Sequence, residues 1–446
     1  MSLLHVSNCS AFWRTQIGVV ILAVGALTIA GCVDVTTPET AAGRSAADDP
    51  ALELLIFHGQ AETLSTVTLD PRDGSIESIT ENVQELGAVP NDIVLGDSAN
   101  EIMITLSGEN RVLILEESTL RIADAIILPT GSNPMASVAL GAEVEAARGL
   151  VATSTLFTGE IFLSDRAGRD WEVSADGAGH VDLSTVGTTL PVNLPLGVAP
   201  QALLSVPAGE PDTLRIVSAS TAYDATRDGD NPFGEATLEE YWITASDSPQ
   251  PTIEIMAVQS GYSFGAINST GLNPTQLTLV PTRGSQPDEI VVVGSGANLS
   301  GSDGGGSDDG RLIVLERDTL AVREDLTIGG SPGSIAMYQG SEGTRIFLAG
   351  PAGIRTVFRD NTDGWTVDPS EESLVYTPAV NSLALIADVA VYSGSTGASL
   401  YATDYWESKL LRFEIGEAGV LYLDQSFDMP QGPQGLLIVD ETESAP

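Results

Sequence analysis

Short apolar runs separated by turn-forming residues recur along the chain from residue 52 to near its end. Each run holds about four to seven residues rich in Val, Ile, Leu and Thr, and Gly, Asp, Ser or Asn stand between the runs; this is the pattern of β-strands. No segment after residue 31 keeps the apolar spacing of an amphipathic helix. The pattern therefore predicts an all-β chain.

One phrase introduces a strand at several points: a Gly, two further residues and a Pro, followed by an apolar run. Clear copies begin at Gly87, Gly131, Gly197, Gly271 and Gly329, and degenerate copies stand at Pro378, before AVNSLALI, and at Gly432. Gly permits a positive φ, and Pro fixes φ and opens a strand without needing an N–H. With about four strands per copy, at spacings of about 45 to 75 residues, the repeat predicts a seven-bladed β-propeller.

The two ends of the repeat region predict how the ring closes. Strand-like runs at 52–57, 64–69 and 75–80 precede the first copy of the phrase, and a single run, Leu436–Val439, follows the last. Three strands at the front and one at the back complete one blade. We therefore predict that the strand at 436–439 is the inner strand of the blade whose other strands lie within 52–80, which leaves no unpaired inner edge.

The segment LYATDY at 400–405, followed by the run KLLRFE at 409–414, resembles the Tyr-Val-Thr-Asn (YVTN) repeat of surface and secreted propellers. In that family the Gly-x-x-Pro phrase opens the inner strand. Only Tyr401 and Thr403 keep the family's letters, and the third and fourth blades carry long insertions. The resemblance, over residues 52–440, is therefore one of pattern, and it implies the propeller fold.

The N-terminal residues form a different unit. Arg14 precedes the apolar stretch Ile17–Gly31, and no Asp or Glu occurs before Cys32. The stretch is shorter than the roughly 20 apolar residues of a membrane span and is typical of a secretory signal. Its end, IAGC at 29–32, resembles the lipobox of bacterial lipoproteins, which implies cleavage before Cys32 and lipid on its sulfur. An ordinary signal peptide with a chance cysteine and an uncleaved anchor are the alternatives.

The predicted organisation is a lipoprotein signal peptide at 1–31, a lipidated tether at 32–50 and the propeller at 51–446. The tether is polar and without apolar periodicity, and a flexible chain of its length reaches about 20–25 Å. Val33, rather than Asp, follows Cys32; by resemblance to lipoprotein sorting this favours the outer membrane if the host has two membranes. We therefore expect an exported protein that lipid on Cys32 anchors to the membrane of the cell envelope.

Charge and cysteine content exclude several classes of partner. The formal net charge is −42, from 61 acidic and 19 basic residues. Such a chain repels phosphate backbones and anionic lipid heads, so nucleic acid is excluded as a partner. The two cysteines are Cys9 and Cys32, and neither lies in the predicted propeller. The propeller therefore has no disulfide, thiolate zinc site or c-type haem attachment, and packing must stabilise it.

Two inserts, 219–240 and 294–310, are predicted to join the second and third strands of consecutive blades. Alternate connections of a blade share an end, so both inserts should lie on the face that carries the Gly-x-x-Pro crossings. They hold carboxylates that are possible Ca²⁺ ligands: Asp228, Asp230, Asp303, Asp308 and Asp309. Neither insert matches the spaced Asp-x-Asp-x-Asp-Gly pattern, and a solvated loop without metal is the plainer interpretation.

Catalytic motifs are absent from the sequence. His58 and His180 are the only histidines after the predicted cleavage point, and neither has a companion at a spacing that suggests a nucleophilic triad. The leading hypothesis is a membrane-anchored, non-catalytic propeller that binds an envelope protein or glycan. The alternative is a lactonase-like or quinoprotein-like propeller enzyme with carboxylate-bound Ca²⁺, which fold alone cannot establish.

The two hypotheses differ in what they require of the central channel. An enzyme requires acidic and polar residues from several inner strands that converge there with raised pKa values. A binding module requires small or apolar residues in the channel and an exposed aromatic patch on the surface.

Overall fold

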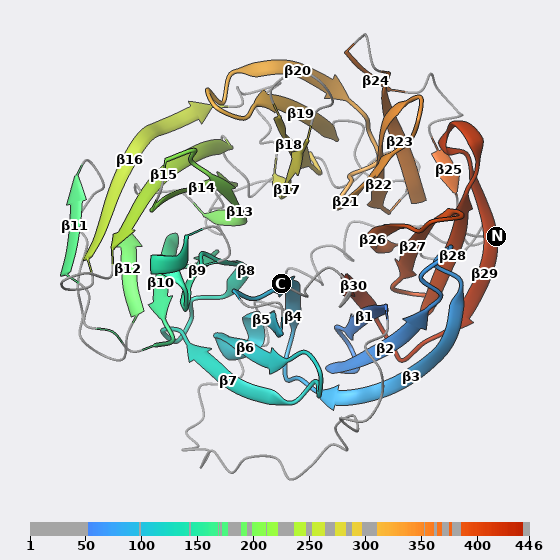
Figure 1. Ribbon diagram of the computed structural model, residues 1–446, viewed down its shortest axis with the longest axis horizontal. Coiled ribbons are helices and arrows are strands. Elements are labelled where there is room, and N and C mark those ends of the chain that lie inside the picture. Colours follow the sequence, from blue (N-terminus) through green and yellow to red (C-terminus); the bar gives the residue numbers. More distant parts are fainter. Residues whose placement is uncertain are drawn as a thin grey trace, which may run out of the picture.

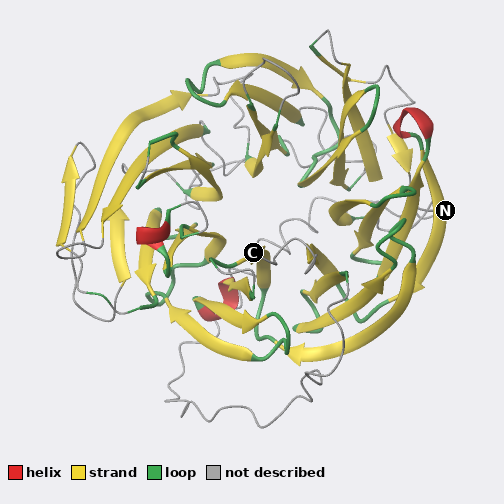
Figure 2. Ribbon diagram, in the orientation of Figure 1, coloured by secondary structure: helices red, strands yellow, loops and turns green. Residues whose placement is uncertain are grey.

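The computed structural model is a ring of seven β-sheets around a central channel (Figure 1). The sheets are the blades of a β-propeller, so the predicted fold is confirmed. Figure 2 shows strands throughout the ring, with short 3₁₀ helices η1 (Ser107–Glu109), η2 (Glu145–Ala147) and η4 (Glu417–Gly419) between them. The structure describes residues 52–97, 100–141, 144–167, 169, 172–176, 189–193, 199–210, 212–221, 236–246, 252–263, 273–281, 288–296, 310–351, 353–360, 364–367, 374–376 and 385–439.

The first three blades each have four strands, which follow one another in space from the channel to the rim. From the inner strand outward, blade 1 contains β30 (Pro433–Val439), β1 (Glu53–His58), β2 (Thr63–Leu69) and β3 (Ile76–Glu85). Blade 2 contains β4 (Pro90–Leu95), β5 (Glu101–Leu106), β6 (Arg111–Glu116) and β7 (Ile122–Ile127). Blade 3 contains β8 (Pro134–Ala139), β9 (Leu150–Thr155), β10 (Glu160–Asp165) and β12 (Thr189–Asn193).

The remaining four blades complete the ring. Blade 4 contains β13 (Pro200–Pro207), β14 (Thr213–Ser220), β15 (Thr237–Ser246), β16 (Thr252–Ser263) and β11 (Glu172–Asp176). Blade 5 contains β17 (Pro274–Val280), β18 (Glu289–Gly294), β19 (Arg311–Glu316) and β20 (Val322–Thr327). Blade 6 contains β21 (Ser334–Gln339), β22 (Gly343–Gly350), β23 (Gly353–Asp360), β24 (Trp365–Val367) and β25 (Leu374–Tyr376). Blade 7 contains β26 (Ile386–Ser393), β27 (Ala398–Asp404), β28 (Lys409–Ile415) and β29 (Leu421–Asp428).

Blade 1 joins the two ends of the described chain. Its inner strand β30 pairs antiparallel with β1, with Glu53 opposite Val439 and Leu55 opposite Leu437. The strand order β3-β2-β1-β30 is the predicted one. The closure prediction is therefore confirmed, and the closing strand begins three residues earlier than predicted, at Pro433.

The crossings between blades have a common backbone geometry. Gly131 has the expected positive φ of 84°, and the residue before the proline is also left-handed, with φ of 53° at Asn133 and 48° at Asn273. Asn tolerates this region better than most residues. The carbonyl of Asn133 accepts a hydrogen bond from the Leu156 amide (3.0 Å), and that of Asn273 accepts one from the Ser295 amide (3.1 Å). Each crossing therefore lies beside the connection between the second and third strands, as predicted.

The prediction is wrong for the inner strand of blade 7, which it placed in AVNSLALI, directly after Pro378. The inner strand β26 begins at Ile386 instead. The Leu385 carbonyl accepts a hydrogen bond from the Tyr405 amide (2.9 Å), which is the contact made before the proline in the other crossings. Because no proline opens this strand, a search for the repeated phrase misplaces it.

Blades 3 and 4 are joined by an exchanged strand. After β10 the chain crosses to blade 4, where β11 pairs in parallel with β16, from Glu172 opposite Thr252 to Asp176 opposite Met256. The chain then returns as β12, which pairs with β10 and completes blade 3. Figure 1 shows β11 outside β16 at the rim of the ring. The outer edge of blade 4 is thus covered by β11, which directly follows strand β10 of blade 3 in the sequence.

Apolar side chains fill the interfaces between neighbouring blades. At the seam between blades 7 and 1, for example, Leu54, Ile56 and Val67 pack against Tyr401 and Leu410. Among the described residues each of the seven interfaces has one such cluster. Burial of these side chains is the main stabilising contribution to the ring. None of the described helices is long and apolar enough to cross a membrane.

A polar clasp reinforces the seam between blades 7 and 1. The turn between β2 and β3 presents its backbone carbonyls to blade 7, and five side chains of blade 7 donate hydrogen bonds to them. The donors are Tyr392 to Pro71 (2.8 Å), Thr396 to Arg72 (3.0 Å), Ser399 to Asp73 (2.8 Å), and both Tyr401 and Arg412 (3.0 Å) to Gly74. Gly74 is buried with φ of 72°, and a Cβ at this position would lie 2.5 Å from the Tyr401 hydroxyl. The seam therefore needs glycine at this turn.

Candidate functional site

The inner strands line a central cavity of about 700 Å³. Its wall mixes small and apolar side chains with polar ones. All seven inner strands contribute residues to this lining. The polar lining residues are Asn91, Asp92, Ser137, Gln201, Thr275, Gln276, Ser334, Asp388 and Gln434. Two carboxyl groups thus lie in the channel, one on β4 and one on β26.

These carboxyl groups belong to a repeated contact between adjacent inner strands. Asp92, two residues after Pro90, accepts a hydrogen bond from the Ser137 amide of the next blade (3.1 Å). Gln276, two residues after Pro274, accepts one from the Ile335 amide of the next blade (2.9 Å). Both contacts join neighbouring blades at the same level of the channel. The residue two positions after the proline of an inner strand therefore provides a side-chain acceptor for a backbone amide of the next blade.

Asp388 makes the same contact at the ring closure. Its Oδ2 accepts a hydrogen bond from the Leu436 amide of the closing strand (2.7 Å). Its Oδ1 accepts hydrogen bonds from the Ser334 hydroxyl of blade 6 and from the Val389 amide (2.8 Å). One carboxyl group therefore connects blades 6, 7 and 1.

Burial in the channel changes the acidity of both groups. Burial raises the pKa of Asp388 to about 6, against the opposing effect of its hydrogen bonds with Ser334, Leu436 and Val389. Burial likewise raises the pKa of Asp92 to about 6; the hydrogen bond from Ser137 opposes the rise, and the charge of Asp388 adds to it. The channel therefore contains two acids that are partly protonated near neutral pH. The described residues contain no group of three or more His, Cys, Asp and Glu side chains that could hold a metal ion.

A third acid lies inside blade 4, near the first insert. Glu239 on β15 is 3% exposed and accepts a hydrogen bond from the Tyr241 hydroxyl (3.2 Å). Burial raises its pKa to about 7, and the bonds from Tyr241 and Thr237 oppose the rise. Ser218, opposite Glu239 on β14, has a buried hydroxyl that finds no hydrogen-bond partner among the described residues. Glu239 is therefore a buried acid of raised pKa within the sheet of blade 4, and it does not line the channel.

The residues predicted from sequence as sites are only partly within the described structure. Cys32 and the five predicted Ca²⁺ ligands, Asp228, Asp230, Asp303, Asp308 and Asp309, lie outside the described residues, as does His180. The flanks of the inserts are described. The Thr221 amide donates to the Ala199 carbonyl (3.0 Å) and the Ser295 amide to the Asn273 carbonyl, so the described residues at the start of both inserts lie beside the crossings of consecutive blades.

His58 ends β1 and is fully buried, with Nε2 2.8 Å from the Ser65 hydroxyl. Burial lowers its pKa to about 4. The His58 imidazole is therefore neutral at physiological pH, and its contact with Ser65 is structural.

Sequence reasoning missed Asp92 and Asp388, although a signal for Asp92 was available. Asp92 and Gln276 stand at the same distance after the proline of their repeat, which marks a repeated structural role. Asp388 gave no such signal because its strand has no proline, so the repeat could not be aligned there.

Comparison with known proteins supports the fold. No family model matches the chain, and no curated protein matches it. A candidate 6-phosphogluconolactonase from Bacteroides fragilis superposes with a TM-score of 0.52 at 12% identity, over 89% of this chain and 100% of that one. A second candidate 6-phosphogluconolactonase, from Bacteroides uniformis, gives 0.51 at 15% identity, over 87% and 100%. Likeness at such identities establishes a shared fold and not a shared activity.

Proposed function

We propose that this protein is a lipoprotein anchored through Cys32 at the cell envelope, where its propeller binds a protein or glycan without catalysing a reaction. One observation carries the non-catalytic part: the channel carboxyl groups already accept hydrogen bonds from neighbouring blades. Asp92 holds the Ser137 amide and Asp388 holds the Leu436 amide. A general base must have its lone pair directed at a substrate proton. Acceptors that hold the ring together are poorly placed for that task.

The anchor rests on the sequence. The apolar stretch, the IAGC segment at 29–32 and the polar tether support lipidation, and Val33 favours the outer membrane in a host with two membranes. The first described residue, Leu52, precedes β1 at the end where Glu53 pairs with Val439. This end of blade 1 is opposite the Gly-x-x-Pro crossings, so Leu52 lies on the face opposite the described flanks of the two inserts.

A second candidate function is supported by a different observation. The raised pKa values of Asp92 and Asp388, in a cavity of about 700 Å³, are what an enzyme of the lactonase or quinoprotein-like type requires of its channel. Carboxylates of the inserts would hold its Ca²⁺. The two proposals differ for the variant Asp92→Asn, which keeps an acceptor for the Ser137 amide but removes the acid. A binding module keeps its partner in this variant, and an enzyme loses activity.

The experiment is mild crosslinking on intact membranes, followed by purification of the protein and mass spectrometry. We expect a partner to be recovered with both the natural chain and the Asp92→Asn variant. Recovery of the protein alone contradicts the binding proposal. In parallel, hydrolysis of a phosphorylated sugar lactone by the natural chain but not by the variant would establish the enzyme instead.

The anchor is tested with Cys32→Ser. The natural chain should sediment with membranes and carry lipid on its N-terminal peptide, while the variant should be released. Membrane retention of the variant contradicts lipidation at this cysteine.

A further inference from the structure

A second large cavity, of about 740 Å³, lies between blades 6 and 7. It opens on the face opposite the Gly-x-x-Pro crossings, because its lining includes the turns between β21 and β22, between β26 and β27, and between β28 and β29. Leu52, the first described residue, lies on the same face. We call this cavity the inter-blade groove.

One wall of the inter-blade groove is a row of side chains on blade 6. Tyr338, Arg345 and Phe358 lie opposite one another on three adjacent strands, so they share one face of the sheet. The Arg345 guanidinium lies 4.5 Å from the centre of the Phe358 ring, a cation–π distance. The other wall consists of glycine-rich turns of blade 7. Gly419 has φ of 70°, and a Cβ there would collide with the Arg345 side chain.

The charge of the inter-blade groove is negative. Glu342, Glu414 and Glu417 line it and are exposed, and Arg345 is the one basic residue among its lining residues. A cationic group in the groove is therefore attracted, and an anionic ligand is repelled.

An apolar patch continues from the inter-blade groove onto the rim of blade 7. Val420, Tyr422 and Leu423 are 46%, 58% and 51% exposed, and they are three of the seven large apolar side chains exposed among the described residues. A Cβ on Gly416, which lines the groove, would lie 2.6 Å from the Tyr422 ring, so the patch and the groove are continuous. A cluster of this kind on a soluble surface marks an interaction site.

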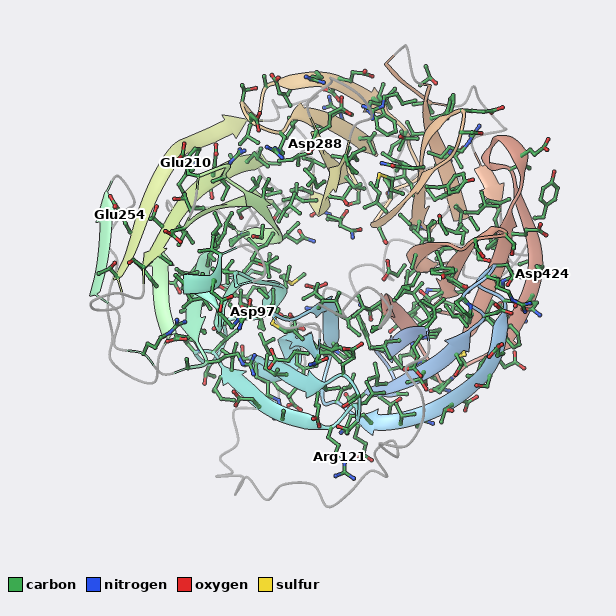
Figure 3. All side chains as sticks on the ribbon, in the orientation of Figure 1. Asp97, Arg121, Glu210, Glu254, Asp288 and Asp424 are labelled. Atoms are coloured by element: carbon green, nitrogen blue, oxygen red, sulfur yellow. The ribbon has the colours of Figure 1, made fainter. Side chains whose placement is uncertain are left out.

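The patch belongs to an edge strand. β29 is the outermost strand of blade 7, and no further described strand pairs with it. Asp424, labelled in Figure 3, marks its position at the rim. An unpaired edge of this kind offers backbone donors and acceptors to an added strand. Blade 4 gives the precedent within this molecule, because β11 adds to the outer edge of β16 in the same way.

We propose that the inter-blade groove and the β29 edge bind an extended, lysine- or arginine-bearing segment of a partner protein. The segment pairs with β29, places an apolar side chain on Tyr422, which lies against Gly416 of the groove, and directs its cation toward Glu342, Glu414 and Glu417. This inference rests on the proposed binding function and names the class of partner. Because the groove lies on the face that carries Leu52, where the proposed tether joins the propeller, a partner on the same membrane is within reach.

The test uses the full mature chain and labelled hexapeptides that alternate lysine with valine, with binding followed by fluorescence anisotropy. The groove variant is Glu342→Gln with Glu414→Gln and Glu417→Gln. The matched control is Glu77→Gln with Glu81→Gln and Glu85→Gln, on the exposed strand β3 of blade 1. Both variants remove three negative charges, so general attraction to the acidic surface falls equally in both.

We expect the groove variant to bind the lysine peptide about tenfold more weakly, at about 0.5 kcal/mol for each of three charges. The control should change affinity by about twofold or less. Tyr422→Ser should also weaken binding, and to the same extent for the lysine peptide and for its glutamine counterpart. Equal losses in both triple variants, or no binding of the lysine peptide to the natural chain, overturn the proposal. Displacement of the peptide by a neutral oligosaccharide, with an affinity that does not change with salt concentration, also overturns the proposal.

The fate of a co-purified membrane partner separates this inference from the proposed function. A partner that is lost from the groove variant and kept by the control supports both. A partner that the groove variant keeps overturns the groove assignment alone, and the absence of any partner contradicts the proposed function itself.

Discussion

The polar clasp at the seam of the ring allows a quantitative test of what holds the propeller closed. The buried Gly74 carbonyl accepts hydrogen bonds from both the Tyr401 hydroxyl and Arg412 Nε. Tyr401→Phe removes one donor and keeps the buried ring, and Arg412→Met removes the other and keeps the aliphatic stem. After either change alone, the carbonyl still has one partner.

The magnitudes follow from these contacts. Loss of the tyrosine hydroxyl should lower the free energy of unfolding by about 1 kcal/mol, the net value of one hydrogen bond. Loss of the guanidinium should cost about 1–3 kcal/mol, because it also donates to Asp73 (3.3 Å) and pairs with Asp424. The double variant leaves a buried carbonyl without any donor, which costs about 1–3 kcal/mol more. The double variant should therefore be less stable than the sum of the single changes.

The assay is urea unfolding of the parent, the two single variants and the double variant, read by circular dichroism. An unchanged slope with urea shows that the variants act on the folded state. A control double-mutant cycle combines Arg412→Met with Tyr392→Phe. The Tyr392 hydroxyl donates to the Pro71 carbonyl and therefore shares no acceptor with Arg412. The control cycle should be additive within about 0.5 kcal/mol. Additivity in the Tyr401 cycle as well would refute the shared-acceptor account of the seam.

Two further predictions concern titration and metal. Glu239 has a folded pKa of about 7 against an ordinary value of 4.5, so its contribution to stability is complete below pH 4.5 and is lost as the pH rises to 7. Glu239→Gln should therefore match the parent near pH 4.5 and exceed it by up to about 3 kcal/mol at pH 8; equal pH profiles of unfolding for the two proteins would contradict the assigned burial. If the inserts hold Ca²⁺, millimolar Ca²⁺ should raise the melting temperature relative to EDTA by mass action, and Asp303→Asn with Asp308→Asn should abolish the increase. No increase in the parent excludes a structural Ca²⁺ site at Asp228, Asp230, Asp303, Asp308 and Asp309.

The sequence predicted neither the acids of the channel nor the inter-blade groove. The hydrogen bond from the Ser137 amide to Asp92 joins residues of different repeats, and the one from the Ser334 hydroxyl to Asp388 joins blades 6 and 7. Such pairs have no local pattern, because the distance between the partners depends on the lengths of the intervening loops. The row formed by Tyr338, Arg345 and Phe358 arises from strand register, which the hydrophobic pattern does not fix for half-exposed positions.

By itself the sequence determined the all-β class, the number of blades, the closing strand and the strands that flank both inserts. Each of these follows from local chemistry: alternating apolar runs favour strands, and Gly-x-x-Pro favours a left-handed turn before a strand. The sequence also indicated the lipoprotein signal, which stays a prediction. Tertiary structure alone decided that β26 begins at Ile386, that β11 joins the neighbouring blade, and that Asp388 connects three blades. These features depend on which edges and carbonyls meet when the ring closes, and that is set by packing between blades and not by any one repeat.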